Sequence, residues 1–342
     1  MYDLVFVTHI PCFYKINLYK RIADSRKIYV IFIGGNTTQL RGNDFCNFQK
    51  LGFDYIILNK EEYELRTKVV SLARLLHALK KIKYRKIIVG GWDLIEFWIV
   101  VLLSAKRKNC LALESSIFNS SIYGIKGLVK RLFLKNISIL LASGSGHKKL
   151  AETLGYKGVV RITLGVGLIN KPVFNVSEKK YSGKYLFVGR LEKEKNLEFL
   201  VEVFNLLPDL TLTIVGVGSE YEYLRSISND NITYAGAVEN SSLQKYFLKS
   251  DFLILPSSSE PWGLVVEESL YYQIPVIVSK TTGASELIVD SGFGVVIDPL
   301  NVNELRDILT GMKYSYHSIL SKKTDFIEKK DKHQLRQYTS IS

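Results

Sequence analysis

The feature that most constrains the fold of this chain is a repeated alternation of short apolar runs with helical segments. Between the runs lie segments such as residues 72–79, whose leucine spacing puts an apolar stripe on one side of a helix. The runs themselves are apolar on both faces, as buried parallel strands are, at residues 4–7, 28–33, 55–58, 86–89, 110–113 and 137–141. This alternation predicts an α/β fold with a doubly wound parallel sheet.

A second series of the same kind follows. The alternation lapses over residues 166–182 and resumes with apolar runs at 185–188, 211–215, 232–234, 252–255, 276–278 and 294–297. We therefore expect two Rossmann-like domains facing across a cleft, with these boundaries: 1–165, a linker at 166–182, 183–313, and a basic segment at 314–342. The sequence leaves open whether the last segment docks back on the first domain or frays.

Composition excludes several classes of protein. The 342 residues are 47% hydrophobic and 23% charged, which is ordinary for a folded protein. Three cysteines without a CxxC spacing indicate neither a disulfide framework nor a zinc site, so we expect a reducing cytoplasm. We also expect no signal peptide and no membrane-spanning helix, because no apolar stretch reaches the ~20 residues that span a bilayer.

Positive charge is concentrated in the first half of the chain. Residues 1–170 contain 27 Lys and Arg against 11 Asp and Glu, whereas residues 171–342 contain 19 against 22. Such asymmetry predicts a polyanionic partner for the first half, either nucleic acid, an anionic bilayer surface or a phosphorylated acceptor. Scattered, solvated lysines are an equally good interpretation.

The first chemical motif is residues 189–196, GRLEKEKN, directly after a predicted strand and at the start of a helix. Arg190 and Lys195 therefore lie at a strand end beside free backbone N–H groups, and this combination favours phosphate. A solvated surface turn is the alternative interpretation of this motif by itself.

The second motif is residues 260–268, EPWGLVVEE, after the predicted strand at 252–255. Gly263 allows close approach of a ligand, and the N–H groups of Leu264 and Val265 begin a helix that can hold a second phosphate. Glu268 is then placed to accept hydrogen bonds from ribose hydroxyls, and Glu260 to meet sugar hydroxyls or developing positive charge. Two phosphate sites on adjacent loops suit a diphosphate.

Taken in order, these motifs resemble the retaining glycosyltransferases of the two-domain GT-B fold, family 4. The resemblance covers roughly residues 2–312 and includes PVIVS at 275–279 and GASE at 283–286. It implies that Arg190 and Lys195 bind the donor diphosphate, that Glu268 binds the ribose, and that Glu260 binds the transferred sugar, with Gly189 also contacting the donor. Glu260, Arg190 and Lys195 are the expected catalytic residues, and further donor contacts are expected from Gly216, Val238, Gly263, Leu264 and Val265.

The resemblance also implies the reaction and its partners. We expect transfer of a hexose-type sugar from a UDP- or GDP-sugar to a glycan or polyprenyl-diphosphate-linked acceptor, with retention of configuration. No Asp-x-Asp motif is present, so we expect no metal and no other cofactor. The expected setting is envelope polysaccharide synthesis, such as O-antigen or capsule, at the cytoplasmic face of the inner membrane, where the basic half would rest on anionic lipid.

Two departures from the family pattern carry expectations of their own. Gln273 stands where family members usually have glycine, so the turn must find another way to accommodate or avoid a left-handed residue, and we expect a local change of the backbone before Pro275. The first loop, residues 8–14, lacks the common glycine-rich stretch, which leaves the identity of the acceptor undetermined.

The candidates for the acceptor side follow the first, fourth and fifth predicted strands. Trp92 is predicted to stack on a sugar or to belong to the core. Glu114 and His9 are candidates to orient or deprotonate the acceptor hydroxyl, although a capping or ion-pairing role is an alternative for Glu114. The complete set is His9, Tyr14, Lys15, Trp92, Asp93 and Glu114.

Other classes of function remain open on the sequence. A sugar-nucleotide epimerase or hydrolase of the same fold would use the same donor motifs. A non-enzymatic binder of anionic surfaces or nucleic acid would use the basic half, but we expect no nucleic-acid partner because no nucleic-acid-binding module is present. A dinucleotide-dependent oxidoreductase is disfavoured, because the VGVG at 215–218 is only a fragment of the GxGxxG dinucleotide-binding motif. The oligomeric state is not predicted.

Overall fold

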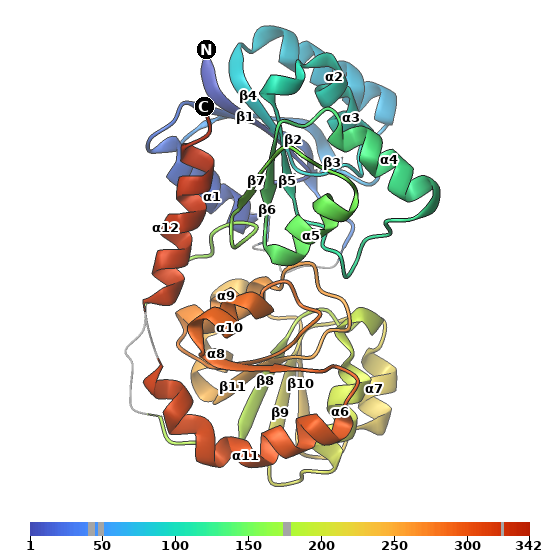
Figure 1. Ribbon diagram of the computed structural model, residues 1–342. Helices are drawn as coiled ribbons and strands as arrows, with labels where there is room; N and C mark the ends of the chain where they lie inside the picture. The colour runs from blue at the N-terminus through green and yellow to red at the C-terminus, as the bar shows by residue number, and fades with distance from the viewer. Residues whose placement is uncertain (40–44, 47–50, 174–178, 323–324) are drawn as a thin grey trace. The chain divides into compact units, whose positions relative to one another are not determined.

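The structure is a computed structural model that describes residues 1–39, 45–46, 51–173, 179–322 and 325–342. The chain forms two compact α/β units, and each is described by itself (Figure 1). Within the described residues, unit 1 comprises Met1–Gln39, residues 45–169 and Lys330–Ser342, and unit 2 comprises Asn170–Lys329. No helix in the described parts of the chain is both long enough and apolar enough to span a membrane.

Unit 1 is built on a parallel sheet of seven strands in the order β3-β2-β1-β4-β5-β6-β7. The strands are β1 (Tyr2–Thr8), β2 (Ile28–Asn36), β3 (Asp54–Glu62), β4 (Tyr84–Val89), β5 (Asn109–Leu113), β6 (Ile139–Ala142) and β7 (Val159–Ile162). The helices are α1 (Phe13–Ala23), α2 (Lys68–Lys81), α3 (Ile95–Leu103), α4 (Gly124–Leu134) and α5 (Ser145–Thr153), with a 3-10 turn η1 (Lys106–Lys108).

Two apolar cores lie on the two faces of this sheet, because the strands are buried on both sides. One core joins the sheet to α2, α3, α4 and α5 through residues such as Leu75, Phe97, Phe133 and Leu150. The other joins the sheet to α1 and to the end of the chain through Ile16, Ile22, Tyr338 and Ile341.

The C-terminal helix α12 (Phe326–Thr339) carries the chain back into unit 1, next to α1 in Figure 1. Two arginines hold its last turn. Arg161 donates to the carbonyl of Gln337 at 3.0 Å, and Arg26 donates to that of Thr339 at 2.7 Å. Tyr338 packs its ring near Phe6 of β1, with ring centroids 6.2 Å apart. The end of the chain is therefore part of the core of unit 1.

Unit 2 repeats the plan with six parallel strands in the order β10-β9-β8-β11-β12-β13. The strands are β8 (Lys184–Val188), β9 (Thr211–Val215), β10 (Ile232–Gly236), β11 (Phe252–Leu255), β12 (Val276–Ser279) and β13 (Gly294–Ile297). Its helices and 3-10 turns are η2 (Lys193–Lys195), α6 (Leu197–Asn205), α7 (Tyr221–Ile227), η3 (Asn240–Ser242), α8 (Gln244–Lys249), α9 (Leu264–Tyr271), α10 (Ser285–Ser291) and α11 (Val302–Ser321).

Each sheet has one point where the strand order reverses direction, between β1 and β4 in unit 1 and between β8 and β11 in unit 2. Loops that leave the carboxyl ends of two such strands diverge to opposite faces and leave a crevice, where open α/β sheets bind ligands. The candidate residues after β1 and β4, and those after β8 and β11, are therefore expected near these two crevices.

All twelve predicted strands are present, but the short edge strand β7 was not predicted. Its four residues are partly or fully exposed, so they lack the apolar pattern of the buried strands. Of the predicted linker, residues 166–169 lie in unit 1, and residues 174–178 lie outside the described residues.

A buried ion pair joins the segment before α2 to α3 in unit 1. Arg66 donates to both oxygens of the Glu96 carboxylate at 2.7 Å, and the Ser71 hydroxyl donates to Glu96 at 2.6 Å. Glu96 is completely buried. Burial alone would raise the pKa of Glu96, but the hydrogen bonds from Arg66 and Ser71 outweigh it and lower that pKa.

We predict that Arg66→Ala lowers the free energy of unfolding of unit 1 by about 3–5 kcal/mol, because the variant leaves the buried Glu96 carboxylate without its cation. Urea unfolding followed by tryptophan fluorescence measures this, since Trp92 and Trp98 both lie in unit 1. The control is Arg85→Ala, which removes an exposed ion pair with Asp3 and should cost at most about 1 kcal/mol. Equal midpoints for the two variants would contradict the prediction.

Candidate functional site

The two motifs of unit 2 lie together at its crevice. The loop at 189–196 leaves β8, the loop at 256–263 leaves β11, and these strands are neighbours in the sheet. The backbone N–H of Ser258 donates to the carbonyl of Glu194 at 3.0 Å, which joins the two loops directly. The N–H of Leu191 donates to Val217 in the loop after β9 at 3.0 Å. Backbone hydrogen bonds thus hold three strand-end loops in one arrangement.

The central contact of the site is an ion pair between Lys195 and Glu260. Both side chains are mostly buried, so the pair is shielded from bulk water. The backbone of Glu260 is held on both sides, because its N–H donates to Thr281 at 3.2 Å and its carbonyl accepts from Gly283 at 3.0 Å. The structure therefore brings together a cation and a carboxylate that the sequence placed on separate motifs.

Arg190 lies on the same loop and is more exposed than Lys195. Its guanidinium donates to the Glu194 carboxylate at 3.0 Å. The sequence analysis did not single out Glu194, although a carboxylate four residues from an arginine is a signal for such a pair. Arg190 remains partly open to solvent and can reach an additional anion.

Asn196 fixes the turn between η2 and α6, a role that the sequence analysis did not assign. Its backbone is left-handed, with φ = 57°, which asparagine tolerates better than most residues. The side-chain amide donates to the carbonyls of Pro256 at 3.3 Å and Pro299 at 2.8 Å. These bonds position the short turn that carries Lys195.

Gly263 precedes α9 with a left-handed backbone, φ = 95°. A β-carbon there would lie 3.0 Å from the Thr282 side chain and 3.2 Å from Leu255, so a larger residue would be tightly packed and would also strain the left-handed backbone. Leu264 and Val265 are the first residues of α9, as predicted. Their N–H groups have no acceptor within the helix and can bind an anion.

The two carboxylates of α9 differ in their surroundings. Glu267 is buried and accepts a hydrogen bond from the indole N–H of Trp262 at 2.6 Å, so it holds the loop before the helix. Glu268 is mostly buried, and no hydrogen-bond or ion-pair partner for its carboxylate is found among the described residues. Burial, together with repulsion from Glu267, raises the pKa of Glu268 to about 8.

Gly216 and Val238 follow β9 and β10, the next two strands of the sheet. Gly216 has φ = 139°, and a β-carbon there would lie 1.8 Å from the carbonyl oxygen of Gly189. The loop after β9 can therefore pass against the Arg190 loop only with glycine at this position. Val238 is partly exposed in its loop.

The prediction of a backbone change at Gln273 is wrong. Gln273 itself adopts the left-handed conformation with φ = 58°, so the turn after α9 keeps the shape that glycine usually provides. The N–H of Ile274 closes this turn on the carbonyl of Ser269 at 2.9 Å. The surrounding hydrogen bonds hold a conformation that glutamine by itself disfavours.

In unit 1, His9 and Asp93 meet at the crevice between β1 and β4. The imidazole Nε2 lies 2.8 Å from the Asp93 carboxylate. Burial opposes ionisation of Asp93, but the hydrogen bond with His9 lowers its pKa overall. The His9 ring also packs edge-on against Tyr63 and Phe97, which fixes its plane.

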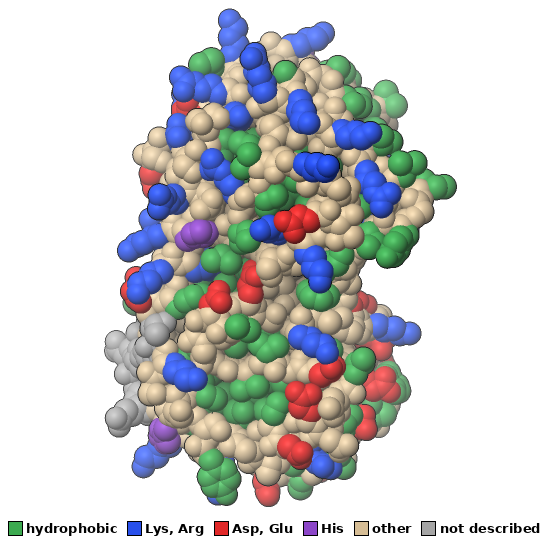
Figure 2. All heavy atoms as spheres, in the orientation of Figure 1, with side chains coloured by type: hydrophobic (Ala, Val, Ile, Leu, Met, Phe, Trp, Pro, Cys, Tyr) green, Lys and Arg blue, Asp and Glu red, His purple; other side chains and the backbone are tan. Residues whose placement is uncertain are grey.

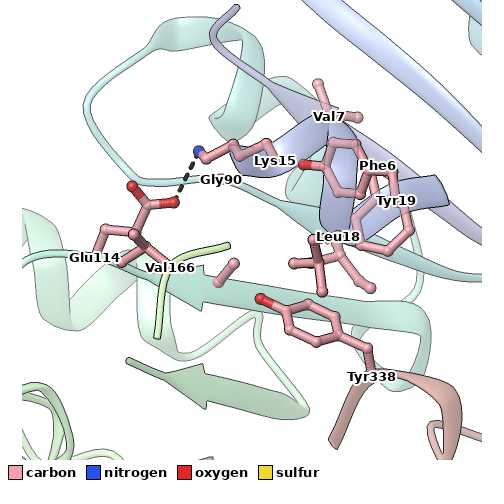
Figure 3. A pocket seen from close by; sticks show the side chains of 11 residues that line it. Phe6, Val7, Lys15, Leu18, Tyr19, Gly90, Glu114, Val166 and Tyr338 are labelled. Carbon is pink, nitrogen blue, oxygen red and sulfur yellow. Dashed lines mark ion pairs between the residues drawn. The ribbon is translucent and has the colours of Figure 1, made fainter. Parts of the chain in front are cut away.

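Lys15 and Glu114 form a second pair, 2.7 Å apart, at the edge of a pocket that Tyr338 of α12 also lines (Figure 3). Burial would lower the pKa of Lys15, but Glu114 and nearby tyrosines raise it well above its usual value, so the ammonium stays charged. The pocket has room for about one water molecule. The ion-pairing alternative for Glu114 is thus observed, and the contribution of Tyr338 was not predicted.

Trp92 and Tyr14 have packing partners in unit 1. Trp92 packs against one apolar core of unit 1, and the Lys130 ammonium lies 5.4 Å from the centre of its ring. Tyr14 packs against Gly167. A β-carbon at Gly167 would lie 2.6 Å from the backbone carbonyl oxygen of Tyr14. Burial raises the pKa of the Tyr14 hydroxyl well above its usual value.

Comparison with known proteins gives a family for the C-terminal part of the chain. The model of the family described as glycosyl transferases group 1 matches residues 171–339. This range contains every candidate donor-binding residue described above.

Two curated relatives are similar over shorter stretches. The O-antigen biosynthesis glycosyltransferase WbnH of Escherichia coli is 33% identical over 166 residues, which cover 48% of this chain and 47% of that protein. An uncharacterized 41.2 kDa protein in the cps region of Klebsiella pneumoniae is 32% identical over 126 residues, covering 36% and 35%. The matched regions are therefore less than half the length of either relative.

Among solved structures, HepE (Alr3699) of Anabaena in complex with UDP and glucose matches with a TM-score of 0.75 at 13% identity, covering 100% of both chains. Likeness at this identity bears on the fold, which is the GT-B fold of two parallel-sheet α/β units. The family match and the motif geometry agree: residues 171–339, just under half of the chain, match the group 1 glycosyl transferases.

Proposed function

We propose that this protein transfers a hexose-type sugar from a UDP- or GDP-sugar to a hydroxyl of a glycan or lipid-linked acceptor. The observation that carries the proposal is the Lys195–Glu260 pair at the crevice of unit 2, beside Arg190 and the N-terminus of α9. Two cations and free backbone N–H groups on adjacent loops suit a diphosphate. A mostly buried carboxylate next to them suits the sugar.

Binding of the donor would separate Lys195 from Glu260. A diphosphate oxygen would bind Lys195, and Arg190 would bind as a planar fork. Glu260, no longer neutralised by Lys195 alone, could then accept hydrogen bonds from sugar hydroxyls. As the bond from the anomeric carbon to the diphosphate breaks, the diphosphate leaves with the electron pair, and positive charge develops on the sugar ring. Glu260 would stabilise that charge, and the two cations would stabilise the leaving group.

We propose retention of configuration and no requirement for a metal. The oxygen of the acceptor hydroxyl would bond to the anomeric carbon on the face that the diphosphate leaves, and a departing phosphate oxygen would take the hydroxyl proton. Support for metal independence comes from Arg190, Lys195 and the α9 N–H groups, which supply positive charge where a metal would otherwise be needed.

The biological setting is proposed from the relatives. The similar Escherichia coli protein is described as an O-antigen biosynthesis enzyme, and the Klebsiella pneumoniae protein lies in a cps region. We place this protein in envelope polysaccharide synthesis, peripherally bound to the cytoplasmic face of the inner membrane. The excess positive charge of residues 1–170 supports contact with anionic lipid.

We predict that the double variant Arg190→Ala, Lys195→Ala loses about 10³-fold or more in kcat, because both cations that stabilise the departing diphosphate are removed. Release of UDP or GDP in the presence of acceptor measures the rate, and circular dichroism checks the fold. Lys193→Ala is the matched control, since Lys193 is an exposed cation on the same 3-10 turn. Near-normal turnover of a folded double variant would refute the proposed function.

We predict that UDP or GDP binds about tenfold more tightly at pH 9 than at pH 7, because ribose hydroxyls donate to the ionised Glu268 carboxylate, whose pKa is about 8 in the free protein. Ionisation is incomplete at pH 7, so binding there must also remove a proton. Isothermal titration across this range measures the slope, and Glu268→Gln should abolish it. Affinity that falls with rising pH would mean that the neutral acid is the binding form.

We predict that His9→Ala lowers kcat/KM for the acceptor about tenfold while leaving UDP or GDP affinity unchanged. The Asp93 carboxylate holds His9 Nε2, which leaves Nδ1 to hydrogen-bond an acceptor hydroxyl. Steady-state kinetics with varied acceptor, together with nucleotide titration, separates the two effects. His77→Ala, which changes an exposed histidine of α2, is the control. An equal loss of nucleotide affinity would contradict an acceptor role.

A further inference from the structure

Helix α4 of unit 1 exposes an apolar stripe to solvent. Ile125 is 81% exposed, Leu128 53%, Val129 41% and Leu132 44%. These positions are spaced i, i+3, i+4 and i+7, so they form one continuous side of the helix. We call these four residues the α4 stripe. A continuous apolar surface of this kind on a folded protein marks a binding surface.

The stripe is not the face that packs the helix onto unit 1. That work is done by Gly127, Phe133 and Leu134, which are buried. Phe133 packs edge-on against Trp98 of α3, with ring centroids 4.9 Å apart. A β-carbon at Gly127 would come within 2.1 Å of the Ile122 carbonyl oxygen, so the helix sits tightly on the loop before it. The opposite face of α4 therefore packs the helix onto unit 1, and the α4 stripe faces solvent.

Cations border the stripe on both sides. By the helical repeat, Lys126 lies on one flank, and Arg131 and Lys135 lie on the other; all three are exposed. The surrounding sequence contains no Asp or Glu from Ser115 to Ala151, whereas it contains six Lys and Arg. Figure 2 shows apolar and basic side chains together over the position of α4 at the right of unit 1.

The end of α3 also exposes apolar side chains. Leu102 and Leu103 are exposed there and are followed by the basic turn η1. Asn109 ties the ends of α3 and α4 together, because its amide donates to the carbonyl of Val101 at 2.8 Å and to that of Asn136 at 3.0 Å. Two neighbouring helix ends thus present leucines next to lysines and arginines.

We infer that α4 binds an anionic lipid bilayer, lying in the interface with the α4 stripe inserted among the acyl chains and its flanking cations on the headgroups. An amphipathic helix with this division of apolar and basic residues is suited to that position. A second copy of the chain is a poor occupant, because two such basic faces would repel each other. Nucleic acid would match the cations but not the stripe. The inference adds a binding surface to the proposed function and can be tested without sugar transfer.

The test is flotation of the full chain with vesicles of phosphatidylglycerol and phosphatidylcholine, compared with vesicles of phosphatidylcholine alone. The wild-type protein should float with the anionic vesicles, and rising salt should weaken but not abolish its binding. Ile125→Ser with Leu128→Ser should lower the vesicle partition coefficient about tenfold or more. Lys126→Gln with Lys135→Gln should lower it mainly on anionic vesicles.

The matched control is Val289→Ser with Leu300→Ser, which removes two exposed apolar side chains from unit 2 and should leave binding unchanged. Nucleotide affinity and melting temperature of the α4 variants should match those of the wild type, which separates this inference from the proposed donor site. Equal flotation of the serine variant and the wild type, or no flotation of either, would overturn the inference. A dimer that only the serine substitutions dissociate would assign the stripe to a protein interface and would also overturn it.

Discussion

The order of parallel strands is the constraint on which the candidate sites depend. In each unit the first strand pairs with the fourth, so loops that are distant in sequence leave the sheet side by side. In unit 2 this adjacency sets Lys195 beside Glu260, although 65 residues separate them. In unit 1 it sets His9 beside Asp93, which are 84 residues apart. Both contacts arise from backbone hydrogen bonding in the sheets, which no single side chain specifies.

Much of this framework is readable in the sequence because buried parallel strands are apolar on both faces. The signal disappears where burial does, as at β7, whose edge position leaves its residues partly exposed. A pattern also does not reveal which side of a helix faces the protein. The spacing of Ile125, Leu128, Val129 and Leu132 is that of an ordinary core-facing stripe, and only the packing of Phe133 and Leu134 shows that it points outward.

The residues of the candidate site could be predicted from the sequence, but their ion-pair partners and pKa values could not. The motifs indicated which cations and carboxylates belong together. They did not indicate that Arg190 forms an ion pair with Glu194. They also did not indicate that the pKa of Glu268, next to the buried Glu267, is raised. Those properties depend on desolvation and on distances between loops, which have no local sequence signature. The left-handed conformation of Gln273 also has no local sequence signature, because the surrounding turn imposes a backbone shape that glutamine disfavours.

The return of α12 to unit 1 has a consequence for how the chain matures. Tyr338 and Ile341 belong to the core beneath α1, and Tyr338 lines the pocket beside Lys15 and Glu114. During synthesis from the N-terminus, these residues emerge only after the whole of unit 2. Until then that core of unit 1 would stay incomplete, so the candidate acceptor-side residues would reach their final surroundings later than the candidate donor site, even though they are translated first.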